Sequence, residues 1–242
     1  MKYSILSLVL CSLFVCGSAF AGGDWTDWFD DYANQSALEA NWTAVSGFAS
    51  GFLDNSRVLS ATQSMKIEKG RKPTRALNTQ GRFTIWVYDD GATPKQFDVE
   101  VHSKGGTPGF VALGLRDDGT SGNDQYTCNI NGTVTKTGIP RTTGWHLFQY
   151  QINNADKGGW KVKLDGKGFP GNVPSLTDGD KVIINTEFGA SGDTNTIWVD
   201  SARYNHNANA DRLLSAVDET YILDYGFEKD VTNWTALPGT VN

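Results

Sequence analysis

Residues 143–166 read TGWHLFQYQINNADKGGWKVKLDG. This stretch contains two runs in which apolar and polar residues alternate, the first with Phe148, Tyr150 and Ile152 and the second with Trp160, Val162 and Leu164. A period of two is typical of strands that place one face in a core, and the glycine-containing segment between the runs provides a turn. The stretch therefore predicts a half-buried β-hairpin.

The same alternation recurs on both sides of the hairpin. Further strands are expected at 42–45, 48–53, 64–67, 83–88, 97–102, 111–116, 181–188 and 196–204. Turn sequences rich in glycine and aspartate separate several of them, and only 34–41 favours a helical turn. Short, regularly spaced strands without a long helical period predict an all-β fold, built as an antiparallel β-sandwich.

The hairpin also resembles one in a known superfamily. Trp145-His146 opens its first strand, and Leu164-Asp165-Gly166 closes its second. This order is similar to the Trp-His to Asp-Gly hairpin of the concanavalin A-like lectin/glucanase superfamily, which includes laminin-G-like domains. The resemblance implies a jelly-roll sandwich over about residues 25–204, and a role in binding glycans or extracellular matrix.

The N-terminal segment has the features of a secretory leader. Residues 1–21 contain a single charge at Lys2, an apolar run over 5–16 and the small-residue sequence Ala19-Phe20-Ala21. The apolar run is too short to span a membrane, so we expect a cleaved signal peptide and no membrane insertion after cleavage. The mature protein is then secreted, extracellular or held in the cell envelope.

A short sequence near the start of the chain recurs near its end. The sequence Asn-Trp-Thr-Ala at 41–44 recurs at 233–236, and Phe29-Asp30 and Phe227-Glu228 precede the two copies. The expected division is a jelly-roll domain at 22–204, a linker at 205–219 and the truncated start of a second, related module at 220–242. The alternative is a coincidental match in a C-terminal tail.

Charge and cysteine content restrict the classes of partner. The formal net charge of −6 argues against nucleic acid and against anionic lipid surfaces as partners. Two of the three cysteines lie in the leader, so only Cys128 remains and no intramolecular disulfide is possible. Cys128 alternates in phase with Tyr126 and Ile130, which predicts a buried structural thiol.

Aromatic and polar residues on the expected strands predict a ligand-binding site. Trp86 and Tyr88 are out of phase with the inward-facing residues of 83–87, so one sheet has an aromatic outer or concave face. Aromatic rings stack on the apolar faces of sugars, and planar polar groups bind sugar hydroxyls. Arg116 and Gln125 are the candidate hydrogen-bonding residues. Alternatively, other chain covers this face and Trp86 belongs to a second small core.

Calcium is the metal that the sequence favours. Asp30 or Asp31, together with Asp200, match positions at which carbohydrate-binding jelly rolls that this chain resembles hold a structural Ca²⁺. Carboxylate oxygens are hard ligands that suit this ion. The alternative is that Asp30 and Asp31 only form a turn and that Asp200 faces solvent.

Evidence for catalysis is weak in the sequence. Members of the superfamily that cleave β-glucans carry Glu-x-Asp-x-x-Glu on one strand. The nearest sequence here, Asp98-Val99-Glu100, lacks the third carboxylate and is interpreted as a solvated polar face. A polysaccharide lyase would need His102, Arg116 and a tyrosine within reach of one another.

The sequence therefore favours a secreted, lectin-like module that binds a polysaccharide, another glycan or a surface without catalysis. One alternative is a structural or adhesive repeat of an extracellular surface protein. The other is a polysaccharide lyase or hydrolase on the same fold, so whether the chain is an enzyme stays open.

Overall fold

The computed structural model describes residues 24–60, 62–78, 80–105, 109–116, 124–152, 162–169, 176, 178–189 and 195–205. Over these residues the chain is β-structure apart from loops and one helix, α1 (Gln35–Asn41). Sheet A contains β1 (Trp25–Asp27), β3 (Phe52–Asp54), β4 (Ser64–Ile67), β6 (Gly81–Asp89), β11 (Gly144–Ile152), β12 (Val162–Leu164), β13 (Lys167–Gly168) and β15 (Ile197–Asn205). Sheet B contains β2 (Thr43–Ala44), β5 (Pro73–Ala76), β7 (Phe97–Ser103), β8 (Phe110–Leu115), β9 (Gln125–Ile130), β10 (Thr133–Pro140) and β14 (Gly179–Asn185).

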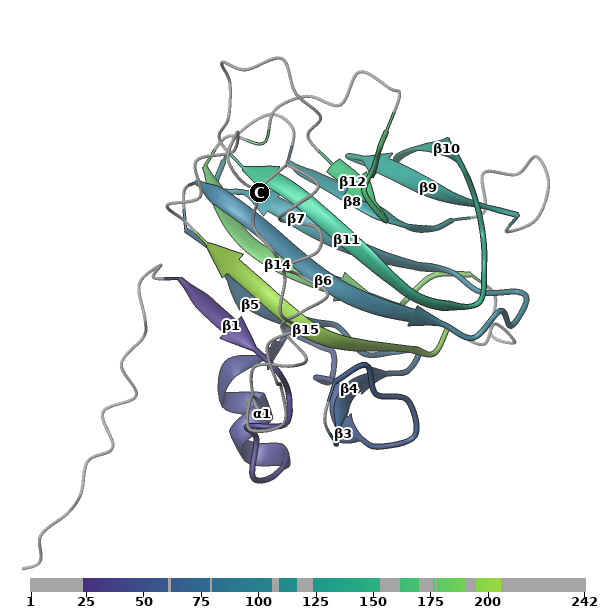
Figure 1. Cartoon of the computed structure of the whole chain (residues 1–242). Coiled ribbons are helices and arrows are strands. Elements are labelled where there is room, and N and C mark those ends of the chain that lie inside the picture. The colour runs from purple at the N-terminus through teal and green to yellow at the C-terminus, as the bar shows by residue number, and fades with distance from the viewer. Residues whose placement is uncertain are drawn as a thin grey trace, which may run out of the picture.

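The two sheets pack face to face, with sheet A in front of sheet B in Figure 1. The order in sheet A is β13-β12-β11-β6-β15-β4-β3, with β1 beside β15, and the order in sheet B is β10-β9-β8-β7-β14-β5-β2. Pairing between these strands is antiparallel throughout. This arrangement confirms the predicted all-β fold class, an antiparallel sandwich of the jelly-roll type.

The predicted hairpin lies toward one edge of sheet A, next to the edge strand β13. Phe148 of β11 pairs with Leu164 of β12, and the turn between these strands falls outside the described residues. The side chains of β11 that face the core are buried, as expected. On the opposite side of the strand Gln149 is fully buried too, although the sequence predicts that this side is exposed. The prediction of a half-buried strand is therefore wrong for most of β11, which is buried on both faces from His146 to Ile152. Alternation identifies the core-facing side of a strand and carries no information about what covers the other side.

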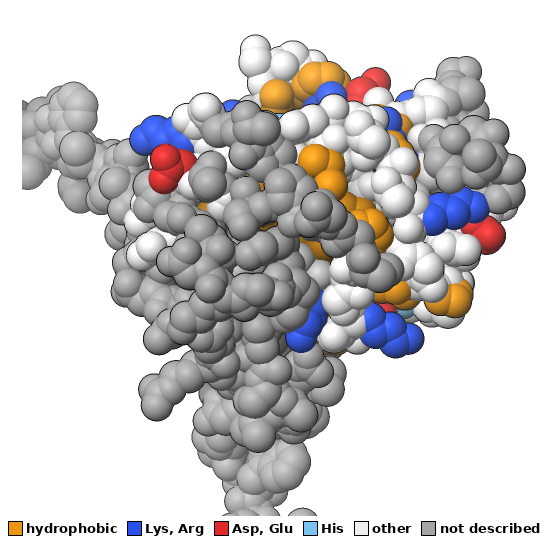
Figure 2. Space-filling view, turned by 90° about the horizontal axis from the view of Figure 1, so that it is seen from above, with side chains coloured by type: hydrophobic (Ala, Val, Ile, Leu, Met, Phe, Trp, Pro, Cys, Tyr) orange, Lys and Arg blue, Asp and Glu red, His pale blue; other side chains and the backbone are white. Residues whose placement is uncertain are grey.

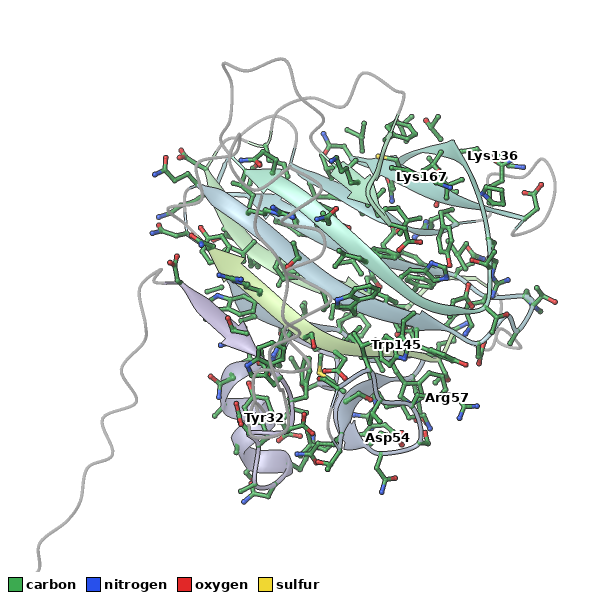
Figure 3. The ribbon with its side chains drawn as sticks, in the orientation of Figure 1. Tyr32, Asp54, Arg57, Lys136, Trp145 and Lys167 are labelled. Atoms are coloured by element: carbon green, nitrogen blue, oxygen red, sulfur yellow. The ribbon has the colours of Figure 1, made fainter. Side chains whose placement is uncertain are left out.

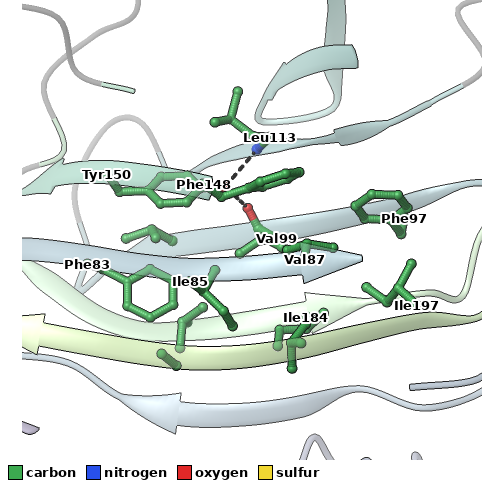
Figure 4. Packing of buried hydrophobic residues seen from close by; sticks show 14 of the residues in the cluster. Phe83, Ile85, Val87, Phe97, Val99, Leu113, Phe148, Tyr150, Ile184 and Ile197 are labelled. Carbon is green, nitrogen blue, oxygen red and sulfur yellow. Dashed lines mark hydrogen bonds between the residues drawn. The ribbon is translucent and has the colours of Figure 1, made fainter. Parts of the chain in front are cut away.

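The core between the sheets consists of alternate residues of the long strands. Figure 4 shows Phe83, Ile85, Val87, Phe148, Tyr150 and Ile197 of sheet A and Phe97, Val99, Leu113 and Ile184 of sheet B. The rings of Phe97 and Phe148 stack across the sandwich with centroids 6.2 Å apart. Burial of this apolar surface supplies the main driving force for pairing the sheets.

Tyr150 joins the two sheets by hydrogen bonds as well as by packing. Its hydroxyl accepts from the backbone N–H of Leu113 and donates to the carbonyl of Val99, and both bonds are drawn in Figure 4. The hydroxyl lies in the hydrophobic core, and Tyr150 is fully buried.

We expect Tyr150→Phe to lower the free energy of unfolding by about 2 kcal/mol, because two buried backbone groups lose their partner while the ring is kept. Urea denaturation checks this value. Tyr204→Phe is the matched control, since the Tyr204 hydroxyl also bonds the backbone at Asn78 and Gln80, but in a less buried position. A loss at Tyr150 no larger than at Tyr204 would contradict the bridging role.

A buried ion pair anchors the N-terminal strand. The Asp27 carboxylate accepts from Arg75 of β5, from the Trp42 indole N–H at 2.7 Å and from the Tyr32 hydroxyl. The Arg75 guanidinium also stacks on the Trp25 ring, 3.9 Å from its centroid. The contacts of Arg75 thereby tie sheet B to β1 of sheet A beside α1, at the lower edge of Figure 1.

Several other expectations concern single residues or segments. Cys128 is buried in the core, which confirms the predicted burial, and this burial raises the pKa of its thiol to about 12. The expected signal peptide (1–21), nearly all of the expected linker (205–219) and the expected second module (220–242) lie outside the described residues. Within the described part of the chain, no helix is long and apolar enough to cross a membrane.

Charged side chains occur in small groups on one face of the described part of the molecule. On the face seen in Figure 2, Lys and Arg side chains stand apart from one another, and hydrophobic side chains are visible between polar ones. Large single-sign basic patches are the usual electrostatic mark of nucleic-acid binding.

Candidate functional site

Strand β7 presents two carboxylates on the face of sheet B that points away from the core. Phe97, Val99 and Val101 belong to the core cluster, so the side chains that alternate with them project to the outer face. These are Asp98 and Glu100, with His102 one position further along. β7 is the fourth of the seven strands of sheet B, so the carboxylates lie near the centre of this face.

Neighbouring strands supply polar partners to both carboxylates. The Asn129 amide of β9 donates to Asp98 Oδ2 at 2.8 Å, and the Asn185 amide of β14 donates to Glu100 Oε1 at 2.8 Å. His102 Nε2 lies 2.7 Å from Glu100 Oε2. We call Asp98, Glu100, Arg116, Asn129 and Asn185 the acidic face.

The environment of Asp98 disfavours its charged form. Burial raises the pKa of the Asp98 carboxyl to about 7, against the opposing effects of the Arg116 charge and the Asn129 hydrogen bond, while the charge of Glu100 adds to the rise. Arg116 Nη1 lies 3.6 Å from Asp98 Oδ2, an ion pair whose geometry falls short of a hydrogen bond.

Three buried polar atoms of the acidic face lack a hydrogen bond. Asp98 Oδ1, Arg116 Nε and Arg116 Nη1 have no hydrogen-bond partner in the described part of the protein. The Arg116 guanidinium is held instead over the ring of Phe188, 3.4 Å from its centroid. Buried polar atoms are nearly always paired in folded proteins, so a cluster of unpaired ones marks a place for a polar ligand or ordered water.

Small residues lie beside the carboxylates on β8. Gly114 pairs with Asp98, and Ala112 pairs with Glu100. A Cβ atom at Gly114 would come within 2.7 Å of Asp98 Oδ1 and 1.9 Å of the Phe97 carbonyl oxygen. The Asp98 oxygen that has no hydrogen-bond partner therefore packs closely against the Gly114 backbone, and only glycine fits at this position.

The sequence-based interpretation of this strand as a solvated polar face is wrong. Asp98 is fully buried and Glu100 is 7 % exposed. Arg116 and Gln125, predicted to bind a ligand, both lie on sheet B: Arg116 directly follows β8 and contacts Asp98, and Gln125 is the first residue of β9. Asn129 and Asn185, which hold the carboxylates, were not predicted.

The other two predicted ligand-binding residues lie on the opposite side of the sandwich. Trp86 and Tyr88 project from the outer face of sheet A, because Val87 between them faces the core. Both are half-buried. The structure thus brings Trp86 and Tyr88 together, and separates them from Arg116 and Gln125.

The grouping that a lyase requires is also not assembled. His102 and Arg116 share the outer face of sheet B, but Tyr126 points into the core, where its hydroxyl donates to the Thr142 carbonyl. Tyr88 belongs to sheet A.

Asp30 and Asp200, two of the residues predicted to bind Ca²⁺, hold the loop between β3 and β4. Asp200 is fully buried and accepts from the backbone N–H groups of Leu59 and Ser60, whereas Asp30 accepts from those of Thr62 and Gln63. Burial raises the pKa of Asp200 to about 6 against three backbone hydrogen bonds, and the charge of Asp30 contributes to the rise.

Asp30 and Asp200 therefore share one neighbourhood, and Asp31 beside them is exposed. Their oxygens suit a hard cation, but no group of three or more His, Cys, Asp or Glu side chains that could hold a metal occurs among the described residues. The Ca²⁺ site stays a prediction.

If Ca²⁺ binds there, adding it to chelator-treated protein is expected to raise the melting temperature by several degrees, since a ligand that binds only the folded state stabilises it. Differential scanning fluorimetry with Ca²⁺ and with EDTA measures the shift, and Mg²⁺ serves as the ion control. Asp200→Asn should abolish the response. An equal response in wild type and Asp200→Asn would place the ion elsewhere.

Comparison with known proteins gives matches in fold only. No protein-family model matches the chain, and no curated protein matches it. The β-glucanase of Bacillus licheniformis is 14% identical with a TM-score of 0.49, and the match covers 76% of this chain and 98% of the glucanase. A sialidase of Trypanosoma rangeli is 17% identical with a TM-score of 0.48, and the match covers 76% of this chain and 33% of the sialidase.

A third solved structure is domain 4 of an extracellular arabinanase from Geobacillus stearothermophilus, in complex with arabinotriose. It is 12% identical with a TM-score of 0.43, and the match covers 72% of this chain and 82% of that domain. The chain spans about a third of the sialidase that it matches.

Proposed function

We propose that this protein binds a neutral glycan on the acidic face of sheet B. One observation carries the proposal: Asp98 Oδ1 and two nitrogens of the neighbouring Arg116 are buried and have no hydrogen-bond partner among the described residues. A ligand that both donates and accepts hydrogen bonds would satisfy the oxygen and the nitrogens at once.

Sugar hydroxyls have this property. Each can donate to a carboxylate and accept from a guanidinium, and the amides of Asn129 and Asn185 extend the set of planar polar groups. Two carboxylates face one arginine here, so a neutral sugar is favoured over an acidic one.

Retention of the full chain on neutral polysaccharides tests the proposal. We expect Asp98→Asn and Glu100→Gln to lose retention on the polymer that holds the wild type, because each replaces a charge-assisted hydrogen bond by a weaker one. Asp180→Asn is the matched control, since Asp180 lies on the same sheet with its side chain 40 % exposed. No retention on any neutral polymer, or equal retention by all four proteins, would overturn the proposal.

Asp98→Asn also gives a prediction about how the stability of the protein depends on pH. The folded-state pKa of Asp98, about 7, lies above the value of about 3.9 for an unfolded chain, so ionisation opposes folding. Wild-type stability should therefore fall relative to that of Asp98→Asn as pH rises from about 4 to about 7, and the difference should then level off. Melting temperatures of both proteins at pH 4 and pH 8 measure it. Parallel curves would contradict the burial of an uncompensated carboxyl.

Hydrolysis is a second candidate function, favoured by the pKa of Asp98. A carboxylic acid with a pKa of about 7 can donate a proton near neutral pH, and Glu100 offers a second carboxylate on the same strand face. Release of soluble sugar by the wild type and not by Asp98→Asn would assign this activity. Retention without release would leave binding as the function.

We also propose that the protein works outside the cytoplasm, supported by the leader-like sequence of residues 1–21. N-terminal sequencing of the protein exported by a bacterial host is expected to begin at Gly22. A start at Met1 would contradict cleavage.

A further inference from the structure

An aromatic row crosses the outer face of sheet A, on the side of the sandwich opposite the acidic face. Strand register places five side chains in line: Trp145 of β11, Tyr88 of β6, Trp198 of β15, Lys66 of β4 and Phe52 of β3. Five adjacent strands at a spacing of about 4.8 Å give the row a length of roughly 19 Å. We call these five residues and Arg57 the aromatic–basic row.

The rings of this row are held in place and do not stack flat on one another. Tyr88 meets Trp145 edge to face with centroids 5.4 Å apart, and it meets Trp198 edge to face at 6.0 Å. The Trp198 indole N–H donates to Asp54 Oδ1 at 3.0 Å, which fixes the tilt of that ring. Tyr88, Trp145 and Phe52 are half-buried, so part of each ring is accessible.

Basic side chains lie over these rings. The Arg57 guanidinium is 5.5 Å from the Tyr88 centroid and 5.9 Å from that of Trp198. Lys66 Nζ is 5.3 Å from the Phe52 centroid, and the Arg71 guanidinium lies over the same ring at 4.7 Å. A cation–π contact positions a cation without neutralising its charge.

The protein has a formal net charge of −6, but three basic side chains gather in this region, Arg57, Lys66 and Arg71, beside the carboxylates of Asp54 and Glu68. Lys66 is partly balanced by Glu68 at 2.9 Å. Arg57, by contrast, is exposed and donates to the neutral Ser56 carbonyl. In Figure 3 Trp145, Arg57 and Asp54 lie at one end of the molecule, whereas Lys136 and Lys167 lie at the other.

We propose that the aromatic–basic row binds an acidic glycan, a polymer whose sugar units carry carboxylates. Sugar rings would pack on Trp145 and Tyr88, as apolar sugar faces do on aromatic side chains. Carboxylates of the polymer would pair with Arg57, whose planar fork suits bidentate binding. This site is separate from the acidic face, and it would stand even if that face bound nothing.

Affinity electrophoresis of the full chain in gels with polygalacturonate tests the site. Arg57→Ala is expected to weaken binding about tenfold, the loss of one charge-assisted contact, and Trp145→Ala to weaken it at least as much. Fully methyl-esterified polygalacturonate, with the same backbone but no carboxylates, should retard the wild type far less. Lys167→Ala is the control, because it removes one exposed positive charge at the other end of the molecule.

Three outcomes would overturn the proposal: no retardation by polygalacturonate, equal retardation by its esterified form, or equal losses in Arg57→Ala and Lys167→Ala. Asp98→Asn keeps the two proposed sites distinguishable. It should leave binding to polygalacturonate unchanged, and Arg57→Ala should leave binding to neutral polymers unchanged. If Trp145→Ala alone loses its fold, circular dichroism will show it, and Arg57→Ala still decides the question because that side chain is exposed.

Discussion

Asp89→Ala is expected to lower the free energy of unfolding by about 3–5 kcal/mol, the usual cost of removing one partner from a buried ion pair. The Asp89 carboxylate at the end of β6 is almost fully buried and accepts two hydrogen bonds from Arg141, at 2.6 and 2.7 Å. Lys95, which has no exposed surface, lies 3.8 Å from the same carboxylate. Alanine at this position would leave the buried Arg141 and Lys95 with less compensating charge.

Urea denaturation at neutral pH measures this loss. Asp124→Ala is the control, since the Asp124–Lys136 pair is also an aspartate ion pair, at 3.1 Å, but its carboxylate is 58 % exposed. Exposed pairs contribute about 0–1 kcal/mol, so this variant should unfold close to the wild type. A loss below about 1 kcal/mol at Asp89 would mean that water screens the pair, against the burial described.

Gly114→Ala is expected to cost about 3 kcal/mol and to impair the acidic face at the same time. The added Cβ would lie 1.9 Å from the Phe97 carbonyl oxygen, which is backbone and can give way only if β7 and β8 move apart. It would also displace the Asp98 carboxylate, at 2.7 Å from Oδ1. One methyl group should therefore weaken both the strand pairing and any ligand binding there.

The control for this substitution is Gly109→Ala. A Cβ atom at Gly109 meets only the Asn131 side-chain oxygen, at 3.2 Å, and the backbone there does not have a positive φ. Thermal unfolding of both variants, with retention on the polymer that binds the wild type, gives the comparison. If Gly114→Ala unfolds like Gly109→Ala, the close approach of β7 and β8 is not required for the fold.

Elements with a regular local signal could be predicted from the sequence. The expected strand 64–67 has the same bounds as β4, and the helical turn expected at 34–41 is α1 preceded by Asn34, whose side chain accepts from the Ala37 N–H. The alternation in 143–166 placed β11 and β12 as neighbours. The alternation of apolar residues, the helix-capping residues and the turn residues each involve only a few neighbouring positions, so they can be recognised in the sequence.

The candidate site was only partly predictable, because it depends on contacts between distant strands. Arg116 was predicted as a ligand-binding residue, but its neighbour Asp98 was not, because an alternating acidic residue has the same pattern on a solvated or a buried face. Asn129 and Asn185 come into contact with the carboxylates only through the strand order β9-β8-β7-β14. Trp145 and Trp198 come into line with Tyr88 only through the register across β11, β6 and β15.

The position of β15 has a consequence for synthesis of the chain. Although it is the last described strand, it lies between β6 and β4, and its residue Tyr204 pairs with Trp25 of the first strand. Sheet A therefore cannot close until residue 205 has left the ribosome, and β1, β4 and one edge of β6 wait with unpaired backbone until then. Nascent chains that stall before β15 should be open to aggregation or to chaperone binding, because long-range pairing is the slow step in such folds.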